Sequence, residues 1–283
     1  MKERAIERLI LISGSTTIVV VLLIFIFLLK DALPALRVAS PWAMISGMHW
    51  YPDDDVFGMW PLIVGSLAVT VGAVVVCTPI GIAAAVYISE IAPRRVREVM
   101  KPAVETLAAF PSVVVGFIGL ALVAPFVKSQ FHLQTGKTAL TGSLMLAFMA
   151  LPTIISISED ALQAVPKEYR AGSLALGATR LQTIFGVVIP AAKRGMMAAV
   201  MLGVGRAIGE TMTVLMVTGN AAVIPHSIAD PVRTMTATIA AEMGEIEQGG
   251  NHYHVLFFVG ALLFAITFLV NLAADLCLHR RSK

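Results

Sequence analysis

The sequence predicts an all-α polytopic membrane protein with six transmembrane helices, and two observations lead to this prediction. Hydrophobic residues make up 57% of the 283 residues and charged residues only 14%, with a mean hydropathy of +0.83, whereas a soluble domain carries about 25% charged residues. The apolar residues also fall into blocks of about 20 residues or more, long enough for a helix to cross about 30 Å of hydrocarbon. Because a backbone in lipid must satisfy its own hydrogen bonds, these blocks are predicted to be helices.

In chain order the predicted spans cover residues 9–29, 61–89, 106–127, 139–158, 195–218 and 255–278. The first block is 21 residues long, whereas the apolar core of a cleaved signal peptide has about 7–15 residues. Lys30 and Asp31 follow it in place of a small-residue cleavage site. We therefore expect this block to be kept as a transmembrane helix, so that residues 1–60 form an N-terminal helix and an outer loop.

The outer loop contains all three tryptophans of the chain, Trp42, Trp50 and Trp60. Amphipathic aromatic side chains are favoured at the boundary between membrane and water, so part of this loop is expected to lie along the outer surface. Residues 53–55 are three consecutive aspartates after Pro52. They are interpreted as a solvated turn, with a metal or partner site as the alternative.

The Lys and Arg residues predict the orientation of the spans. If the N-terminus is cytoplasmic, 15 of the 21 basic residues fall in cytoplasmic segments, five in outer segments and one, Arg206, inside the membrane. Because cytoplasmic segments carry an excess of Lys and Arg, both termini are predicted to be cytoplasmic. The cytoplasmic residues are Lys2, Arg4, Arg8, Arg94, Arg95, Arg97, Lys101, Lys167, Arg170, Arg180, Lys193, Arg194, Arg280, Arg281 and Lys283.

Motifs that would indicate catalysis or cofactor binding are incomplete. Gly136-Lys137-Thr138 ends like a phosphate-binding P-loop, but Phe131 occupies the position of its first glycine. All six histidines fall outside the apolar blocks, so an intramembrane base beside a nucleophile is not expected. No basic tract indicates nucleic-acid binding. The sequence therefore predicts no catalytic residue, no metal site, no cofactor on this chain and no nucleic-acid partner.

The fifth block carries an ionisable pair, Arg206 and Glu210, which are four residues apart and so are expected on one helix face. Ionisable groups at membrane depth cost a few kcal/mol and usually face a protein interior or a watery path. Two interpretations stay open, a structural ion pair that locks helices together and a pathway or gate element for an anion. Thr213 extends the polar stripe, and Gly205 with Gly209 would let another helix approach closely.

Residues 159–194 are predicted as a cytoplasmic segment patterned for helix. Pro166 fits a helix start, Gly177 permits close approach by another backbone, and Pro190 ends or kinks the run before the fifth span. A short helical hairpin at the inner surface could dock into a partner's groove. The alternative is an ordinary amphipathic connector.

The same segment resembles the EAA loop of ABC-importer permeases. Gly177 and Pro190 match the spacing of that family's pattern, whereas Ala171-Gly172-Ser173 replaces its opening Glu-Ala-Ala triplet. Residues 57–67, 108–117 and 151–154 are similar to phosphate permeases, and 205–212 is similar to the fifth span of the C-type subunit of the Pst system. The resemblance covers roughly residues 57–281.

This resemblance implies a type I ABC importer permease (MetI-like) fold over residues 61–283, in a bacterial or archaeal cell (inner) membrane, with inorganic phosphate as transported substrate. It implies as partners a second, homologous permease, a dimer of ATPase subunits that carry ATP and Mg²⁺, a periplasmic phosphate-binding protein and membrane lipid. The chain itself would not be an enzyme.

The resemblance also assigns roles to individual residues. The loop at 159–194 would couple to the ATPase. Apart from the resemblance, our hypothesis from the intramembrane charges is that Arg206, Glu210 and Thr213 contribute to the translocation pathway or its gate. The residues that would make the coupling contacts are Tyr169, Ala171, Gly172, Leu176, Gly177 and Ala178.

Two other functions remain as alternatives. One is a permease for another oxyanion, such as molybdate or sulfate. The other is an ion-coupled secondary transporter, a class that shows inverted repeats with broken helices at the midplane. No internal repeat is found in this sequence.

Overall fold

The structure is a computed structural model. It describes the backbone of residues 2–279 and, within that range, every side chain except those of residues 2–5, 8, 274, 275 and 277–279. In this part of the chain six helical runs are long and apolar enough to cross a membrane. This confirms the predicted number of spans. In the structure the six spans are Leu9–Arg37, Trp60–Ile91, Ser112–Gln130, Ala139–Gln163, Arg180–Ile208 and Asn251–Ala273.

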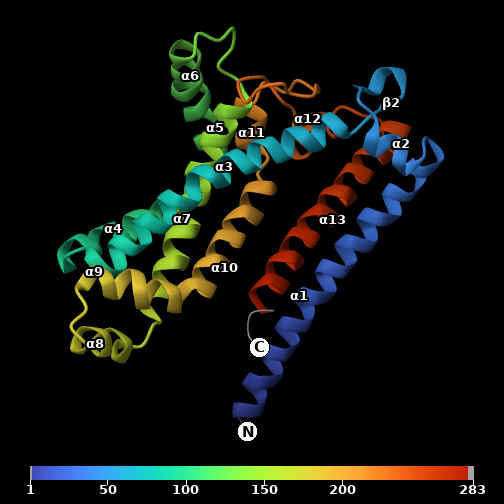
Figure 1. Cartoon of the computed structure of the whole chain (residues 1–283). Coiled ribbons are helices and arrows are strands. Elements are labelled where there is room, and N and C mark those ends of the chain that lie inside the picture. Colours follow the sequence, from blue (N-terminus) through green and yellow to red (C-terminus); the bar gives the residue numbers. More distant parts are fainter. Residues whose placement is uncertain (1, 280–283) are drawn as a thin grey trace.

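The first and last helices lie side by side. Helix α1 (Lys2–Ala32) begins, and α13 (Asn251–His279) ends, at the end of the molecule that carries α8 (Lys167–Ala175) (Figure 1). We call this the α8 end. The two helices pack through aromatic pairs, among them Phe25 and Phe264 with ring centroids 5.0 Å apart. The basic residues Arg280, Arg281 and Lys283 lie outside the described residues, as do the side chains of Lys2, Arg4 and Arg8.

The opposite end, which we call the hairpin end, holds the connection between the first two spans. A 3-10 turn η1 (Leu33–Arg37) and a short helix α2 (Pro41–Ser46) lead into strands β1 (Trp50–Tyr51) and β2 (Val56–Phe57). The strands pair antiparallel around the turn η2 (Pro52–Asp54). The three aspartates at 53–55 therefore form an exposed hairpin turn, in which Asp55 adopts a φ of 54°.

The tryptophans of this connection do not all lie at a surface. Trp42 is 77% exposed, but Trp50 is only 4% exposed. The Trp50 indole Nε1 donates to Glu242 Oε1 at 3.1 Å, and this carboxylate also binds Arg233 Nη1 at 2.8 Å and His252 Nε2 at 2.8 Å. Trp50 therefore joins the β1–β2 hairpin to the region before the last helix, whereas Trp42 stays exposed.

The second and third spans are separated by a helix that hydropathy did not indicate. Helix α3 (Trp60–Val86) continues into a π-helical turn η3 (Tyr87–Ile91), and the amphipathic helix α4 (Arg94–Ala108) follows. The third span starts only at Ser112 and consists of α5 (Ser112–Ile118), the π-helical turn η4 (Gly119–Val123) and α6 (Ala124–Gln130). The predicted start at residue 106 is wrong because extended Pro111, which cannot continue α4, separates the two helices.

The fifth span differs from its prediction at both ends. Helix α9 (Arg180–Thr183), the π-helical turn η5 (Ile184–Val188) and α10 (Ile189–Ile208) form one helical run. It begins earlier than residue 195 because Thr179 and Gln182 form a capping box that starts a helix there. It ends at Ile208, and a separate helix α11 (Met212–Val217) follows. Arg206 and Glu210 therefore do not share one helix face, contrary to the prediction.

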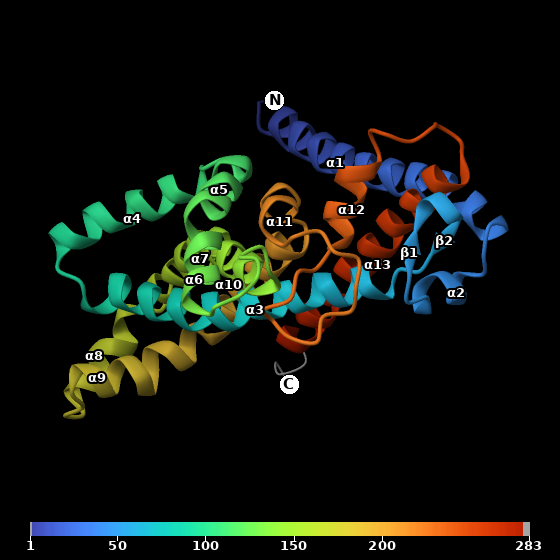
Figure 2. The ribbon, with the colours of Figure 1, turned by 90° about the horizontal axis from the view of Figure 1, so that it is seen from above.

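The fourth span, α7 (Ala139–Gln163), is the centre of the molecule. The loop before α12 (Met235–Glu242) caps its start, since Ala139 N and Leu140 N donate to Asp230 O at 2.9 Å and Ile228 O at 2.8 Å. Figure 1 and Figure 2 both place α4, α8 and α9 on the opposite side of the molecule from α1, α13 and the β1–β2 hairpin. Helix α3 runs between these two sides.

Ile154 of α7 marks the point where three spans come into closest contact. It is fully buried, with Gly81 of α3 on one side and Gly203 of α10 on the other. A Cβ added at either glycine would lie 2.7 Å from an Ile154 side-chain carbon, so only glycine allows this approach. Ala199, Gly203 and Ala207 are all buried at four-residue spacing and define the packed face of α10.

Among the described residues no helix makes the close approach predicted at Gly205 and Gly209. A Cβ at Gly205 would meet Asn271 Oδ1 at 3.7 Å, an ordinary contact, and one at Gly209 would meet only backbone carbonyls of the preceding turn. The reason is register, since these two glycines lie off the face that Gly203 directs toward α7.

We predict that Gly203→Val lowers the stability of the fold by about 1–3 kcal/mol, because the added methyl groups overpack the Ile154 contact. Gly14→Val is the matched control, since nothing lies within 4 Å of a Cβ built at Gly14 on the exposed face of α1. Thermal unfolding in detergent measures both variants. Equal melting temperatures would contradict the packing argument.

Candidate functional site

The hairpin made by α8 and α9 at the α8 end is the candidate site for contact with a partner. The turn between the helices is exposed, and Leu176 at its tip is 91% exposed. Gly177 adopts a φ of +85°, and a Cβ built there would have no atom of this chain within 4 Å. The glycine is therefore needed for the conformation of the turn, while the space beside it is open.

The structure places all six predicted coupling residues on α8 or in this turn. Tyr169 is 56% exposed, Ala171 and Gly172 are exposed, and Ala178 is half-buried. None of the six belongs to the buried core of the chain. An exposed apolar tip on a short helical hairpin is a surface that a partner's groove can accept.

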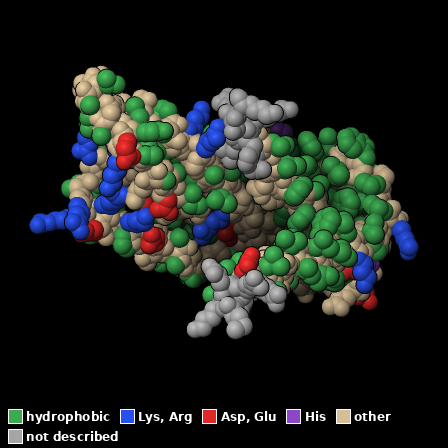
Figure 3. All heavy atoms as spheres, turned by 90° about the horizontal axis from the view of Figure 1, so that it is seen from below, with side chains coloured by type: hydrophobic (Ala, Val, Ile, Leu, Met, Phe, Trp, Pro, Cys, Tyr) green, Lys and Arg blue, Asp and Glu red, His purple; other side chains and the backbone are tan. Residues whose placement is uncertain are grey.

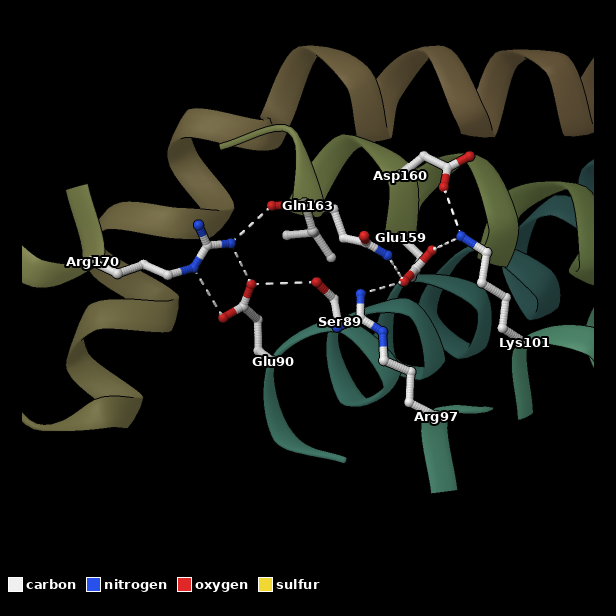
Figure 4. Close-up of polar contacts among 9 residues, drawn as sticks. Ser89, Glu90, Arg97, Lys101, Glu159, Asp160, Gln163 and Arg170 are labelled. Atoms are coloured by element: carbon white, nitrogen blue, oxygen red, sulfur yellow. Dashed lines mark hydrogen bonds and ion pairs between the residues drawn. The ribbon is translucent and has the colours of Figure 1, made fainter. Parts of the chain in front are cut away.

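Arg170 holds α8 against the ends of two spans (Figure 4). Its Nη2 and Nε donate to the two carboxylate oxygens of Glu90 at 2.6 and 3.3 Å. The same guanidinium donates to two carbonyls at the end of the fourth span. These are Leu162 O in the last turn of α7, at 2.9 Å, and Val165 O just after α7, at 2.7 Å. A planar guanidinium with five donors suits such a shared contact better than an ammonium.

A second ionic cluster lies beside the first and ties α4 to α7. Glu159 of α7 is 1% exposed and accepts from Arg97 Nη2 at 2.8 Å and Lys101 Nζ at 2.7 Å. Gln163 also donates to it, and Lys101 pairs with Asp160 at 3.0 Å. Figure 4 shows both clusters along the ends of α3 and α7.

Lys101 responds electrostatically to this arrangement. Its hydrogen bonds to Glu159 and then to Asp160 raise the pKa of its ammonium group above the ordinary lysine value, despite the opposing effect of burial. As long as its partner carboxylates are ionised, Lys101 contributes its full stabilisation below the ordinary lysine pKa and loses it as the pH rises through the raised pKa. Lys101 therefore stays protonated, and the cluster intact, throughout the physiological range.

Arg206 and Glu210 lie near each other in the sequence but make separate contacts. Arg206 Nη1 donates to Thr153 Oγ1 at 3.2 Å and Nη2 donates to Ala108 O at 3.3 Å. Glu210 lies between α10 and α11, where its Oε1 accepts from Thr213 N at 3.3 Å. No ion pair joins the two residues in the described part of the chain. The structural ion pair considered from the sequence is therefore not formed.

Thr213 is fully buried. Its hydroxyl donates to Ser112 O at 3.0 Å and also contacts Met149 Sδ at 3.0 Å, which joins α11 to α5 and α7. In this conformation its role is to connect helices, whereas Arg206 and Glu210 are only half-buried.

The face at the α8 end is hollowed (Figure 3). Lys and Arg side chains gather on the α4, α8 and α9 side of the hollow, whereas hydrophobic side chains cover the α1 and α13 side. This division fits a molecule whose α1–α13 pair faces lipid and whose opposite side meets charged or polar surroundings.

The sequence interpretation missed the residues that anchor α4 and the α8–α9 hairpin to the ends of the spans. It counted Arg97, Lys101 and Arg170 only as loop charges, and it gave Glu90 and Glu159 no role as anchors. A usable signal was present, because Glu90 and Glu159 each stand at the end of a long apolar block. An acid at that depth must find a cation or hydrogen-bond donors.

Six candidate spans and an exposed helical hairpin at one end are features expected of the membrane-embedded subunit of a transporter. Residues 77–283 match the family described as binding-protein-dependent transport system inner membrane component, and the chain belongs to this family. It is therefore a multi-pass component of the inner membrane and a transport subunit, not an enzyme. Membership in this family of ABC transporter permeases implies an ATPase partner and a binding protein.

Several individual proteins are similar to this chain in sequence or in fold. The chain is 42% identical to the probable ABC transporter permease protein YqgH of Bacillus subtilis over 86% of this chain and 79% of that protein. It is 35% identical to the phosphate transport system permease protein PstC of Mesorhizobium japonicum, over 84% and 78%. The inward-facing MetNI methionine ABC transporter shares the fold, with a TM-score of 0.63 at 20% identity over 80% of this chain and 98% of that one. The expected MetI-like permease fold is thus confirmed.

We predict that Glu159→Gln destabilises the chain by about 1–3 kcal/mol, because it leaves Arg97 and Lys101 without a buried countercharge. Asp160→Asn is the matched control, since the Asp160 side chain is 67% exposed and its loss should cost less than about 0.5 kcal/mol. Thermal unfolding in detergent, with α4 monitored by hydrogen exchange, measures both. Equal effects of the two substitutions would show that the buried carboxylate has no special role.

Proposed function

We propose that the chain is the permease half of an ATP-driven importer of inorganic phosphate. The observation that carries the substrate assignment is the environment of Arg206. This half-buried guanidinium lies near the end of the fifth span and is held by two neutral oxygens. Among the described side chains no carboxylate pairs with it, so its positive charge remains available to an anion. Similarity to PstC, a phosphate transport system permease, supports the choice of anion.

The orientation belongs to the same proposal. The α8 end carries most of the basic residues outside the spans, including those of α4 and α8. An excess of Lys and Arg is typical of cytoplasmic segments. We therefore assign the α8 end and both termini to the cytoplasm, and the hairpin end to the outer side.

The partners follow from this orientation. A second, homologous permease would complete the pathway, an ATPase dimer carrying ATP and Mg²⁺ would sit below the α8 end, and a periplasmic phosphate-binding protein would deliver substrate above. In this arrangement residues 1–60 supply the first helix and the hairpin, residues 61–283 form the transport domain, and 159–194 include the coupling hairpin. Tyr169 and Leu176 are the exposed side chains that would enter the ATPase.

We expect Arg206→Ala to lower phosphate uptake about tenfold or more, because a charge-assisted contact to an anion is worth about 1.5–3 kcal/mol. Arg206→Lys should retain part of the rate. Uptake of radiolabelled phosphate and growth on limiting phosphate measure the effect at matched membrane levels, with Arg95→Ala on exposed α4 as control.

Undiminished uptake by Arg206→Ala would exclude the assigned role. Wild-type uptake of molybdate or sulfate in preference to phosphate would exclude the substrate. Phosphate uptake that needs no ATPase would exclude the whole class and favour an ion-coupled carrier.

We expect Gly177→Trp to weaken ATPase binding, because the indole would fill the open space beside the turn. Gly177→Asn is the control that separates bulk from backbone conformation, since asparagine tolerates a positive φ. Co-purification of the ATPase with each variant measures the contact. The same ATPase yield with tryptophan as with glycine would show that the turn lies outside the interface.

A further inference from the structure

The two arms of the α8–α9 hairpin are both attached to one residue, Glu90 of the π-helical turn η3. We propose that Glu90 is the positioning residue that transfers movement of this hairpin to α3. The proposal rests on the proposed function, because it takes the hairpin as the surface on which an ATPase acts.

The first attachment is ionic. Arg170 of α8 binds the Glu90 carboxylate through two nitrogens, the shorter contact being 2.6 Å. The Glu90 side chain is 10% exposed and that of Arg170 is 23% exposed, so water screens the pair only weakly. Ser89 Oγ donates to the same carboxylate at 3.3 Å. A bidentate, mostly buried pair fixes direction as well as distance.

The second attachment uses the backbone of the same residue. Arg180, at the start of α9, donates through Nη2 to the Glu90 carbonyl. Within the hairpin, Ser173 Oγ and Thr183 Oγ1 lie 2.9 Å apart and join the two helices. Displacement of either arm therefore acts on the same residue of the second span.

The place of attachment favours transfer into the membrane. Glu90 lies in the turn closed by Ala92 N donating to Tyr87 O at 2.8 Å, and π-helical turns often mark functional sites and kinks. Directly before it, α3 runs without interruption through Gly81, which packs on Ile154 of α7. A shift at Glu90 thus reaches the contact between the central helices.

The α8–α9 hairpin has a free tip and a fixed base. Leu176 is 91% exposed and Gly177 has open space beside it, so a partner can engage the tip. Arg170 also holds the carbonyls of Leu162 and Val165, so α8, α3 and the end of α7 move as one unit. Loss of the Glu90 carboxylate should leave the tip able to bind, while α3 follows its movement less closely.

The test compares Glu90→Gln, Glu90→Asp and Arg170→Gln in the assembled transporter, reconstituted with its ATPase, second permease and binding protein. Two quantities are measured, the phosphate imported per ATP hydrolysed and the change in hydrogen exchange of residues 60–91 when ATP is added. Arg94→Gln is the matched control, because Arg94 forms an exposed pair with Glu98 at 2.8 Å.

We expect Glu90→Gln and Arg170→Gln to lower the phosphate-to-ATP ratio about fivefold or more, the low end of typical coupling between sites. The ATP-dependent change in exchange over residues 60–91 should become smaller while that of α8 persists, because the contact of Arg180 with the backbone carbonyl of residue 90 remains. Glu90→Asp should restore part of both, and Arg94→Gln should alter neither.

Two results would overturn the proposal. One is an unchanged exchange response over residues 60–91 in both glutamine variants. The other is a proportional fall of import and hydrolysis, which a merely structural role would give. A wild-type complex that moves no phosphate would instead refute the proposed substrate, and the exchange measurement would still decide the role of Glu90.

Discussion

The arrangement at the α8 end depends on two carboxylates that stand where long helices leave the apolar region. Glu90 and Glu159 are nearly buried, and each is surrounded by donors from a segment outside the spans. A buried carboxylate without such partners would be strongly unfavourable, so each carboxylate requires cations beside it. This requirement fixes α8 through Arg170 and α4 through Arg97 and Lys101. These peripheral helices are therefore held mainly by ion pairs, since α8 buries no residue and α4 buries only Val104.

The interior of the bundle relies on a different interaction. Lipid tails are as apolar as the side chains they would replace, so helices in a membrane gain little from hydrophobic burial and depend on close packing. Gly81 and Gly203 supply it by letting α3 and α10 approach Ile154 from two sides. The chain thus combines a tightly packed centre with an ionically attached periphery. A displacement of the helices at the α8 end can therefore reach the packed centre without loosening the contact at Ile154.

The number of spans could be predicted from the sequence because apolar length alone determines which segments cross a bilayer. The boundaries could not, since α4 is amphipathic and the fifth span starts among polar residues at Arg180, where hydropathy gives no signal. The α8–α9 hairpin could be predicted from the spacing of Gly177 and Pro190. Its anchor was not found, because Glu90 and Arg170 are 80 residues apart and only the fold brings them together. Glu210 was assigned to the Arg206 helix because four-residue spacing assumes that the helix continues.

Arg206 differs from the other half-buried Lys and Arg side chains in the described part of the chain, because it meets no carboxylate. Arg97, Lys101, Arg170 and Arg233 each meet a carboxylate at 2.6–2.8 Å, and these contacts build structure. Arg206 meets a hydroxyl and a carbonyl instead, while nearby Glu210 accepts a backbone N–H at the start of α11. Neutral oxygens orient a guanidinium without cancelling its charge. Under the proposed function, a cation held in this way would be ready to meet an anion, whereas one already paired would first have to be released.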